Sequence, residues 1–455
     1  MNKHKFIYFI GIGGIGMSAL ARFYKYHKYE VAGYDSTPSE LTGELENSGI
    51  SIHYNDGVEN IPEKFRDRET IVVYTPAIPD SSKELNYFRQ NGNRLMKRAA
   101  MLGHIARDRK VFAVAGTHGK TTTSTMLAYL LTKIANGCTA FLGGISKNYD
   151  TNLLLSTNNV MVAEADEYDR SFLQLYPYVA VVTAADADHL DIYGTEHEMK
   201  KSFGDFVSQI SSDGALVLKK GVDIPLDGTS CKIYSYSLDD SSADFYASDI
   251  KNENGFYSFT VHTPFYTVEN CKLGTPGKVN VENAVAAVAA SCFASVAGKD
   301  CIRELLKSFS GVKRRFDIQV NTSEHVYIDD YAHHPEELNA AISSVRQMFP
   351  NRKITGVFQP HLFTRTRDFA DGFARSLSLL DELILLDIYP ARELPIEGVS
   401  SQIIFDKVTL ANKQMCSKDQ LINLLENTAI DVLITMGAGD IDRFVEPVKN
   451  LFVGT

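Results

Sequence analysis

Short apolar runs alternate with longer stretches of helical spacing along the first hundred residues. The runs lie at residues 6–10, 30–34 and 70–74, and residues 17–26 carry apolar side chains at the spacing of a helix. Alternation of this kind predicts parallel strands that are connected by crossover helices. The first part of the chain is therefore expected to form an α/β domain with a parallel sheet.

The same alternation returns twice further along the chain. Apolar runs at 111–115, 160–165 and 179–183 predict a second sheet. Residues 213–268 are richer in Ser, Asp and Tyr and alternate in polarity, which favours antiparallel strands or hairpins added to that domain. A third group predicts, in order, strand 326–330, helix 336–348, strand 354–358, helix 367–380, strand 383–387 and strand 432–436.

The length of the chain requires more than one hydrophobic core. At 455 residues it exceeds the roughly 250–300 residues that a single core usually supports. The three groups of elements predict three domains, which span residues 1–98, 99–312 and 313–455.

Composition narrows the class of protein. Hydrophobic residues make up 44% and charged residues 22%, which is typical of a folded globular chain, and the net charge of −10 argues against a nucleic-acid partner. No apolar stretch approaches the roughly 18 residues that a membrane span needs. The N-terminal apolar run is interrupted by glycines within a few residues, which argues against a signal peptide. Six scattered cysteines without a CxxC pair predict neither a zinc site nor disulfides, so a reducing cytoplasm is expected.

A glycine-rich segment, GIGGIG, lies between the first predicted strand and the first predicted helix. Gly11, Gly13, Gly14 and Gly16 allow a tight turn and the close approach of a pyrophosphate, and Asp35, at the end of the next strand, is placed to accept from a ribose hydroxyl. NAD, FAD and UDP-sugars all contain a pyrophosphate and a ribose. The alternative without a ligand is a glycine-rich turn that only serves the packing of the domain. The segment predicts a nucleotide site without identifying the nucleotide.

A second loop, AGTHGKTTT, has the character of a phosphate-binding loop. Val114 stands where the general GxxxxGK[ST] pattern has glycine, so this loop is a shortened form. Its backbone N–H groups and the Lys120 ammonium suit a phosphate, and the Thr121 hydroxyl suits Mg²⁺. The predicted ATP-binding residues of this loop are Gly116, Thr117, His118, Gly119, Lys120, Thr121 and Thr122.

Acidic residues follow the next two predicted strands of the second domain. Glu164 ends one strand, where a carboxylate can reach a metal at the phosphate loop, and Asp166, Glu167 and Asp169 follow it with Arg170 to offset their charge. A solvated acidic turn is the alternative. After the next strand, a second metal site is predicted around His189, although imidazole is an unusual Mg²⁺ ligand; its acidic neighbours are Asp186, Asp188 and Asp191.

Two loops of the third domain carry imidazole, guanidinium and carboxylate groups. YIDDYAHHPEE and FQPHLFTRTRDF each follow a predicted strand, so their side chains are expected at a sheet end, where they suit a ribose, a phosphate or a carboxylate. For single residues the alternative is structural, such as a turn at His334 or a surface charge at Arg367. The residues concerned are Asp329, Asp330, His333, His334, His361, Arg365 and Arg367.

Taken together, the motifs resemble those of the Mur ligases over the full chain. GIGGIGMS, GTHGKTTT, EADE, DADHLD, GVKRRF, DDYAHHP, FQPH with TRTRDF, and DIYPARELP occur in the order of that family. The resemblance implies an N-terminal Rossmann-like domain for a UDP-sugar, a central ATPase domain of phosphate-loop type, and a C-terminal Rossmann-like domain that closes on ATP and the amino acid. It implies ATP and Mg²⁺ as cofactors and an acyl-phosphate intermediate.

The resemblance also implies roles for single residues. Lys120, Glu164 and His189 are expected to be catalytic. Two Mg²⁺ ions are expected, one served by Thr121 and a second ligated by Glu164 and His189. Further ATP contacts are expected from Asn283 at the adenine and from Arg315 and Asp330 at the ribose or phosphates, and substrate contacts from His334, His361 and Arg365. The chain departs from the family pattern at Tyr168, Val279 and Leu362.

Within the family, the similarity is greatest to members that join L-alanine to UDP-N-acetylmuramate. The alternative within the family is a recycling ligase that adds a tripeptide to the same UDP-sugar. Alternatives from other classes are a nicotinamide-dependent oxidoreductase, which leaves AGTHGKTTT unexplained, and a non-catalytic nucleotide sensor, for which Glu164 and His189 are superfluous. Monomer and homodimer are both open.

Overall fold

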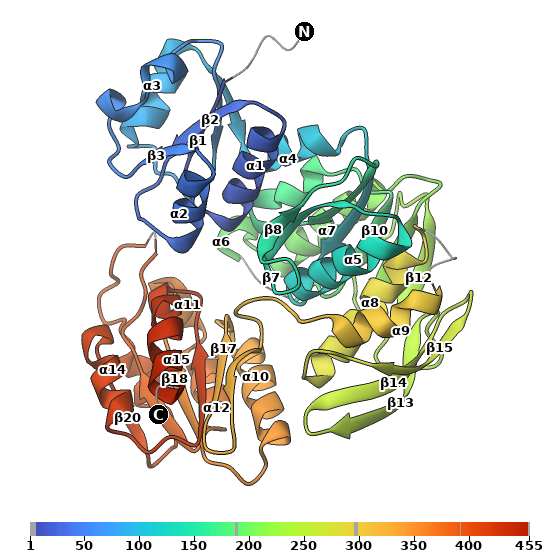
Figure 1. Cartoon of the computed structure of the whole chain (residues 1–455), viewed down its shortest axis with the longest axis vertical. Helices are drawn as coiled ribbons and strands as arrows, with labels where there is room; N and C mark the ends of the chain where they lie inside the picture. Colours follow the sequence, from blue (N-terminus) through green and yellow to red (C-terminus); the bar gives the residue numbers. More distant parts are fainter. Residues whose placement is uncertain (1–5, 187–189, 295–298, 392, 454–455) are drawn as a thin grey trace. The chain divides into compact units, whose positions relative to one another are not determined.

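The computed structural model describes residues 6–186, 190–294, 299–391 and 393–453. Figure 1 shows the helices and strands along the chain. By internal contacts the chain divides into two compact units. The first unit contains residues 1–249, 259–272 and 281–310, and the second contains residues 250–258, 273–280 and 311–455. The described residues form four sheets, of which three are the large sheets of α/β layers.

The N-terminal sheet is parallel throughout, in the order β3-β2-β1-β4-β5. Because β1 lies between β2 and β4, the chain leaves it in one direction and later returns on its other side, which creates the switch point where α/β folds bind ligands. The glycine-rich turn follows β1 at this point. The elements are β1 (Phe6–Ile10), α1 (Ile15–Tyr26), β2 (Glu30–Tyr34), α2 (Glu40–Asn47), β3 (Ser51–His53), β4 (Ile71–Tyr74), α3 (Lys83–Asn91), β5 (Arg94–Lys97) and α4 (Arg98–Ala106).

The central sheet has the order β12-β11-β10-β6-β9-β7-β8, and β8 is antiparallel to its neighbour β7. Its middle strand, β6, lies between β10 and β9 and leads into the phosphate loop. The strands are β6 (Lys110–Ala115), β7 (Thr139–Ser146), β8 (Thr151–Leu154), β9 (Val160–Glu164), β10 (Val179–Val182), β11 (Ala215–Lys219) and β12 (Lys232–Tyr236). The helices of this part are α5 (Lys120–Ile134), the 3₁₀ segment η3 (Tyr168–Gln174), α6 (Leu190–Tyr193), α7 (Glu196–Ser208), α8 (Lys278–Ser291) and α9 (Lys299–Ser308).

The expectation of antiparallel strands across residues 213–268 is wrong for the first part of that stretch. Strands β11 and β12 extend the central sheet in parallel. Residues 215–217 are buried in succession, which is typical of a strand covered on both faces. Helix α7 lies between β10 and β11 in the chain and forms the crossover connection that a parallel pair needs. The later part forms the expected hairpin: β13 (Tyr246–Glu253) and β14 (Phe256–His262) join through Asn254 and Gly255, both at positive φ, and β15 (Thr267–Lys272) completes a three-stranded sheet.

The third large sheet has the order β16-β17-β21-β18-β19-β20, and β16 is antiparallel to β17. The strands are β16 (Asp317–Asn321), β17 (Val326–Asp330), β18 (Ile354–Phe358), β19 (Glu382–Leu385), β20 (Lys413–Met415) and β21 (Val432–Met436). The helices are α10 (Pro335–Met348), α11 (Phe363–Asp368), α12 (Ala370–Leu377), α13 (Gln402–Phe405), α14 (Lys418–Glu426) and α15 (Val445–Val453).

The predicted single helix 367–380 is wrong, because α11 and α12 meet at a break. Phe369 has φ −113° and ψ 15°, outside helical values, and its ring lies against the imidazole of His334 with 4.8 Å between centroids. A tertiary contact therefore accompanies the interruption of a helical pattern.

None of the helices in the described ranges is both long and apolar enough to cross a bilayer.

Within the first unit, α1 packs directly on the edge of the central sheet. The fully buried side-chain amide of Asn152, in β8, donates to the carbonyl of Ile15 at 2.6 Å and to the hydroxyl of Ser18 at 3.0 Å. Arg22 donates to the Thr151 hydroxyl at 3.0 Å and to the side-chain oxygen Oδ1 of Asn152 at 3.2 Å. These polar contacts orient the helix that begins at the glycine-rich turn against strand β8.

We predict that Asn152→Ala destabilises this joint. The substitution removes two hydrogen bonds, to the Ile15 carbonyl and to the Ser18 hydroxyl, and the loss of each costs about 0.5–1.5 kcal/mol. The Ile15 carbonyl still accepts from the Ser18 hydroxyl at 2.9 Å. Urea unfolding followed by circular dichroism measures the change, because the chain has no tryptophan for fluorescence. Asn159→Ala, at an exposed position five residues on from β8, should stay within about 0.5 kcal/mol of the parent. Equal stability of the two variants would contradict the prediction.

Candidate active site

The glycine-rich turn has the geometry that requires glycine. Gly11 has φ +83°, and its N–H donates to the carbonyl of Tyr34 at 2.8 Å. A methyl group on Gly13 would lie 2.8 Å from Cγ2 of Thr42 and 3.0 Å from Oδ2 of Asp35, so there is no room for one. Gly14 is the N-cap residue of α1 and Gly16 lies in its first turn. Backbone N–H groups at this helix end are suited to an anion.

Asp35, the predicted ribose acceptor, also supports the turn. Its Oδ2 accepts from the N–H of Gly13 at 2.8 Å, and its Oδ1 accepts from the N–H of Thr37 at 3.2 Å. The carboxylate is half-buried beside the turn. It is therefore next to any nucleotide bound there, and its role toward a ribose stays a prediction.

The phosphate loop is held against the end of β10. Gly116 and Gly119 have φ of +132° and +79°, and a methyl group on Gly116 would lie 2.2 Å from the hydroxyl of Thr183. That hydroxyl donates to the carbonyl of His118 at 2.5 Å. The N–H of Thr117 donates to the carbonyl of Ala184 at 3.3 Å. The loop leads into Gly119, the N-cap of α5, and Lys120 to Thr122 form the first turn of that helix.

Lys120 forms a buried ion pair with Glu167. Its Nζ lies 2.8 Å from Oε1 of Glu167, which is fully buried, and donates to the carbonyl of Gly116 at 2.6 Å. Burial by itself lowers the pKa of Lys120, but the carboxylates of Glu167, Asp166 and Glu164 outweigh it and raise that pKa. The ammonium is thus kept charged and positioned at the loop.

Glu167 was named by sequence reasoning as one of several acids, without a role. Its partner lies 47 positions earlier in the chain, so no local pattern signals the pair. The hydroxyl of Tyr193 donates to the backbone carbonyl of Glu167 at 2.5 Å and further fixes the loop.

Glu164 and Thr121, two of the predicted metal ligands, lie in contact. The Thr121 hydroxyl donates to Oε1 of Glu164 at 3.1 Å, and the N–H of Gly143 donates to Oε2 at 3.1 Å. A methyl group on Gly143 would lie 2.1 Å from that Oε2, so only glycine leaves the carboxylate this place. A hydroxyl and a carboxylate are hard oxygen donors of the kind that Mg²⁺ prefers, so the pair fits this ion.

The third predicted ligand, His189, lies outside the described residues, as does Asp188. Among the residues that are described, no group of three or more His, Cys, Asp or Glu side chains could hold a metal ion. Both Mg²⁺ sites stay predictions, and of their predicted ligands the structure describes Thr121 and Glu164. Asp186, whose Oδ2 lies 3.5 Å from the Thr117 hydroxyl, is near the phosphate loop.

Asn283, the predicted adenine contact, lies beside the phosphate loop. Its Oδ1 accepts from the hydroxyl of Thr123 at 3.2 Å, and a methyl group on Gly119 would lie 2.9 Å from the same oxygen. Helix α8 thereby delivers a largely buried amide to the start of α5. Its neighbour Val279, where the family pattern has histidine, is about half exposed.

Basic residues from the N-terminal domain hold the acidic loop that follows β9. Arg98 pairs with Asp166 at 2.9 Å, and Lys97 pairs with Asp169 at 2.8 Å. Sequence reasoning expected Arg170 to offset these acids; instead its Nε donates to Ser202 at 3.2 Å and its guanidinium lies over the ring of Tyr193. The two basic partners lie about seventy positions earlier, so sequence reasoning missed both.

In the second unit, Asp330 and Arg315 gather where β17 ends. Asp330 accepts from the N–H groups of Phe316 and Ala332, both at 2.7 Å. The guanidinium of Arg315 lies 4.9 Å from the ring centre of Tyr331. Burial raises the pKa of Asp330 to about 6, against the opposing charge of Arg315. Its neighbour Asp329 is structural, because it is fully buried and paired with Arg314 at 3.1 Å.

Two of the predicted substrate-side residues, His334 and His361, make ring contacts in the same unit. His361 stacks on Tyr389 with 5.8 Å between centroids, and His333 lies 6.1 Å from His361. Burial lowers the pKa of His333 to about 4, and the charge of Arg365, in α11, contributes to the lowering. His334 packs on Phe369 instead. Leu362 is largely buried at φ +69°, so this departure from the family pattern faces the interior of the unit.

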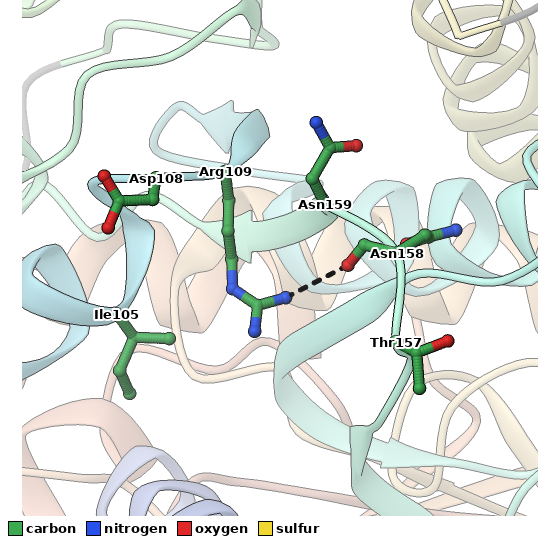
Figure 2. A pocket seen from close by; sticks show the side chains of 6 residues that line it. All are labelled: Ile105, Asp108, Arg109, Thr157, Asn158 and Asn159. Carbon is green, nitrogen blue, oxygen red and sulfur yellow. Dashed lines mark hydrogen bonds between the residues drawn. The ribbon is translucent and has the colours of Figure 1, made fainter.

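Figure 2 shows a surface pocket of the first unit, whose volume is about 340 Å³. It is found at the amino ends of β6 and β9, whereas the phosphate loop follows the carboxyl end of β6. Arg109 donates to the carbonyl of Asn158 at 3.5 Å across it. None of the predicted site residues lines the pocket, whose walls are Ile105, Asp108, Arg109, Thr157, Asn158 and Asn159.

Comparison with protein families identifies all three parts of the chain. Residues 6–110 match the family described as "Mur ligase family, catalytic domain", residues 114–291 the "Mur ligase middle domain", and residues 314–439 the "Mur ligase, glutamate ligase domain". The matches confirm the predicted fold class of three α/β domains and the resemblance seen in the motifs. The boundaries near residues 98 and 312 stay predictions.

Individual proteins are similar over nearly the whole length. A UDP-N-acetylmuramate–L-alanine ligase of Parabacteroides distasonis is 52% identical over 454 residues, which cover 99% of this chain and 98% of that protein. One from Porphyromonas gingivalis is 51% identical, with 98% of each covered. Among solved structures, a UDP-N-acetylmuramate–alanine ligase of Thermotoga maritima superposes with a TM-score of 0.83 at 26% identity, covering 99% of this chain and 100% of that one.

The raised pKa of Asp330 predicts a pH dependence of stability. The folded state keeps this proton up to about pH 6, whereas an unfolded aspartate releases it near pH 4, so between these values the folded state binds more protons. The free energy of unfolding therefore falls as the pH rises through this window. Asp330→Asn removes the group, and urea unfolding at pH 4 to 7 should show a shallower fall. An unchanged slope would mean that Asp330 titrates normally.

Proposed function

Because this chain belongs to the Mur ligase family, we propose that it joins L-alanine to the lactyl carboxylate of UDP-N-acetylmuramate with consumption of ATP, as a step in peptidoglycan precursor synthesis. The observation that carries the proposal is the assembly at the phosphate loop, where Lys120 pairs with Glu167 and Thr121 contacts Glu164. These groups suit the transfer of a phosphoryl group. The choice of L-alanine is supported by relatives at about half identity that carry this activity in their names.

The reaction proceeds in two steps. A lactyl carboxylate oxygen attacks the γ-phosphorus of ATP, the bond to the β-phosphate oxygen breaks, and an acyl phosphate and ADP result. The free amine of L-alanine then attacks the acyl carbon, and the tetrahedral intermediate loses a proton and collapses to the amide and inorganic phosphate. Both steps use bound substrates only, so no covalent enzyme intermediate forms.

The chain contributes position and charge to these steps. The N–H groups at the start of α5 and the Lys120 ammonium stabilise negative charge on the transferred phosphoryl group. Glu167 keeps Lys120 in place, because the buried pair leaves the ammonium little freedom. Thr121 would hold one Mg²⁺ at the phosphates, and Glu164 would hold a second with His189, as the family resemblance implies. Bound there, Mg²⁺ supplies neutralising charge to the phosphate oxygens.

The remaining assignments follow the same proposal. The turn at Gly11 to Gly16 and Asp35 bind the UDP portion, residues 99–312 bind ATP with Asn283 as a contact, and residues 313–455 supply contacts to ATP and the amino acid. In that last part Arg315 and Asp330 face ATP, and His334, His361 and Arg365 serve the substrate side. A cytoplasmic location is supported by six cysteines that are all free thiols. Neither a nucleic-acid nor a membrane partner is proposed.

Release of inorganic phosphate tests the activity. The protein is supplied with ATP, Mg²⁺ and UDP-N-acetylmuramate, and L-alanine, L-serine, glycine and the tripeptide are added one at a time. We expect L-alanine to give the highest kcat/KM. A requirement for the tripeptide would favour the recycling ligase instead, and no phosphate release with any amine would exclude the ligase proposal.

Substitution of Lys120 separates catalysis from UDP-sugar binding. Lys120→Ala should lower kcat by at least about 100-fold, because it removes a charge that stabilises the transition state. Calorimetry should still detect UDP-N-acetylmuramate binding at the glycine-rich turn. Lys133→Ala, at an exposed position in the last turn of the same helix, should change kcat by less than about twofold. Loss of UDP-sugar binding in a folded Lys120→Ala variant would contradict the proposed division of sites.

A further inference from the structure

Arg98 lies between the two predicted nucleotide sites of the first unit. It is the first residue of α4, directly after β5. Its Nη1 lies so close to Gly16, in the first turn of α1, that a methyl group on that glycine would be 2.9 Å away. Its Nη2 donates to Oδ2 of Asp166 at 2.9 Å. One guanidinium thus lies beside the glycine-rich turn with one nitrogen and donates to the acidic loop of the ATP site with the other.

Asp166 connects Arg98 to the catalytic lysine. It directly precedes Glu167, the buried partner of Lys120. Its other oxygen accepts from the N–H of Tyr168 at 3.1 Å, and its carbonyl accepts from the N–H of Phe172 at 2.9 Å, so its side chain and backbone shape the loop. The charge of Asp166 also acts on Lys120. A displacement of Arg98 therefore changes both the charge and the conformation next to the Lys120–Glu167 pair.

We propose that Arg98 is a positioning residue that couples the UDP-sugar site to the ATP site, by bridging the first turn of α1 at Gly16 and the Asp166 carboxylate of the loop that holds Lys120. The inference rests on the proposed function, since it takes the UDP-sugar to occupy the glycine-rich turn. A diphosphate at that turn is an anion next to Nη1, and it fixes the guanidinium in the orientation that holds Asp166.

The bridge depends on the fork shape of arginine. Two nitrogens of a planar guanidinium can serve two partners at fixed geometry, whereas the ammonium of lysine is a point charge. The neighbouring pair of Lys97 and Asp169 provides a contrast on the same loop. Its basic side chain is more exposed, with 51% of Lys97 accessible against 23% of Arg98, whereas the two carboxylates are similarly accessible, at 30% for Asp169 and 36% for Asp166. An exposed pair of this kind contributes little.

The experiment measures the affinity for a non-hydrolysable ATP analogue with Mg²⁺, with and without saturating UDP-N-acetylmuramate, in the full-length protein. Coupling between two sites typically amounts to about 5- to 150-fold in affinity, and we expect the parent protein to fall in this range. Arg98→Gln should reduce the ratio to near one and lower kcat more than it raises KM for ATP. Arg98→Lys should recover only part of the ratio, because it restores charge without the fork.

Three further variants separate positioning from general destabilisation. Lys97→Gln is the matched control and should keep the coupling ratio within about twofold of the parent. Asp166→Asn should lose coupling as Arg98→Gln does, and the double variant should be no worse than either single one. A methyl group on Gly16 would lie 2.9 Å from Nη1 and 3.2 Å from Cδ of Arg98, so Gly16→Ala displaces the Arg98 side chain and should weaken coupling while thermal stability is kept. If Arg98→Gln does not fold, Gly16→Ala and Arg98→Lys provide the same comparison.

The outcomes distinguish the inference from the function on which it rests. A parent protein that releases phosphate with L-alanine but binds the analogue equally well with and without the UDP-sugar overturns the inference alone. So does an Arg98→Gln variant that matches Lys97→Gln, or additive losses in the double variant. A parent protein without any phosphate release removes the proposed function, and the inference with it.

Discussion

The buried ion pair between Lys120 and Glu167 is the interaction on which the arrangement of the central site depends. A fully buried carboxylate is costly unless a partner compensates its charge, and Lys120 at 2.8 Å is that partner. The same ammonium donates to the carbonyl of Gly116, so the pair joins the phosphate loop to the acidic loop after β9. Removal of Lys120 would leave the Glu167 carboxylate in a place where water cannot solvate it.

Sheet topology brings the members of this site together. Strands β6, β9 and β10 are parallel neighbours, so the loops that follow them emerge at one edge of the sheet. The phosphate loop follows β6, Glu164 ends β9, and Thr183 follows β10. Close approach then depends on glycine: a methyl group on Gly116 or Gly143 would collide with the Thr183 hydroxyl or the Glu164 carboxylate. Several glycines of the chain are thus explained by tertiary contacts rather than by local turns alone.

The joint between the N-terminal and central parts of the first unit has a polar character. Asn152 and Arg22 connect α1 to strand β8, and Arg98 connects the beginning of α4 to the acidic loop. Hydrogen bonds and ion pairs constrain orientation more than apolar contacts do, because they require defined angles and distances. The glycine-rich turn is therefore placed in a defined way against the loop that holds Lys120.

The sequence by itself determined the nature of the elements and the kind of chemistry. Runs such as 6–10 and 354–358 are short apolar stretches with flanking turn residues, and these local patterns specify strands wherever they lie. Motifs such as GTHGKTTT and EADE likewise carry their chemistry in adjacent residues. Only the tertiary structure decided that Glu167 faces Lys120, that Arg98 rather than Arg170 compensates the acidic loop, and that β11 and β12 pair in parallel. The reason is that each of these depends on contacts across long loops, where the partner is selected by sheet order and packing and leaves no periodic trace in the chain.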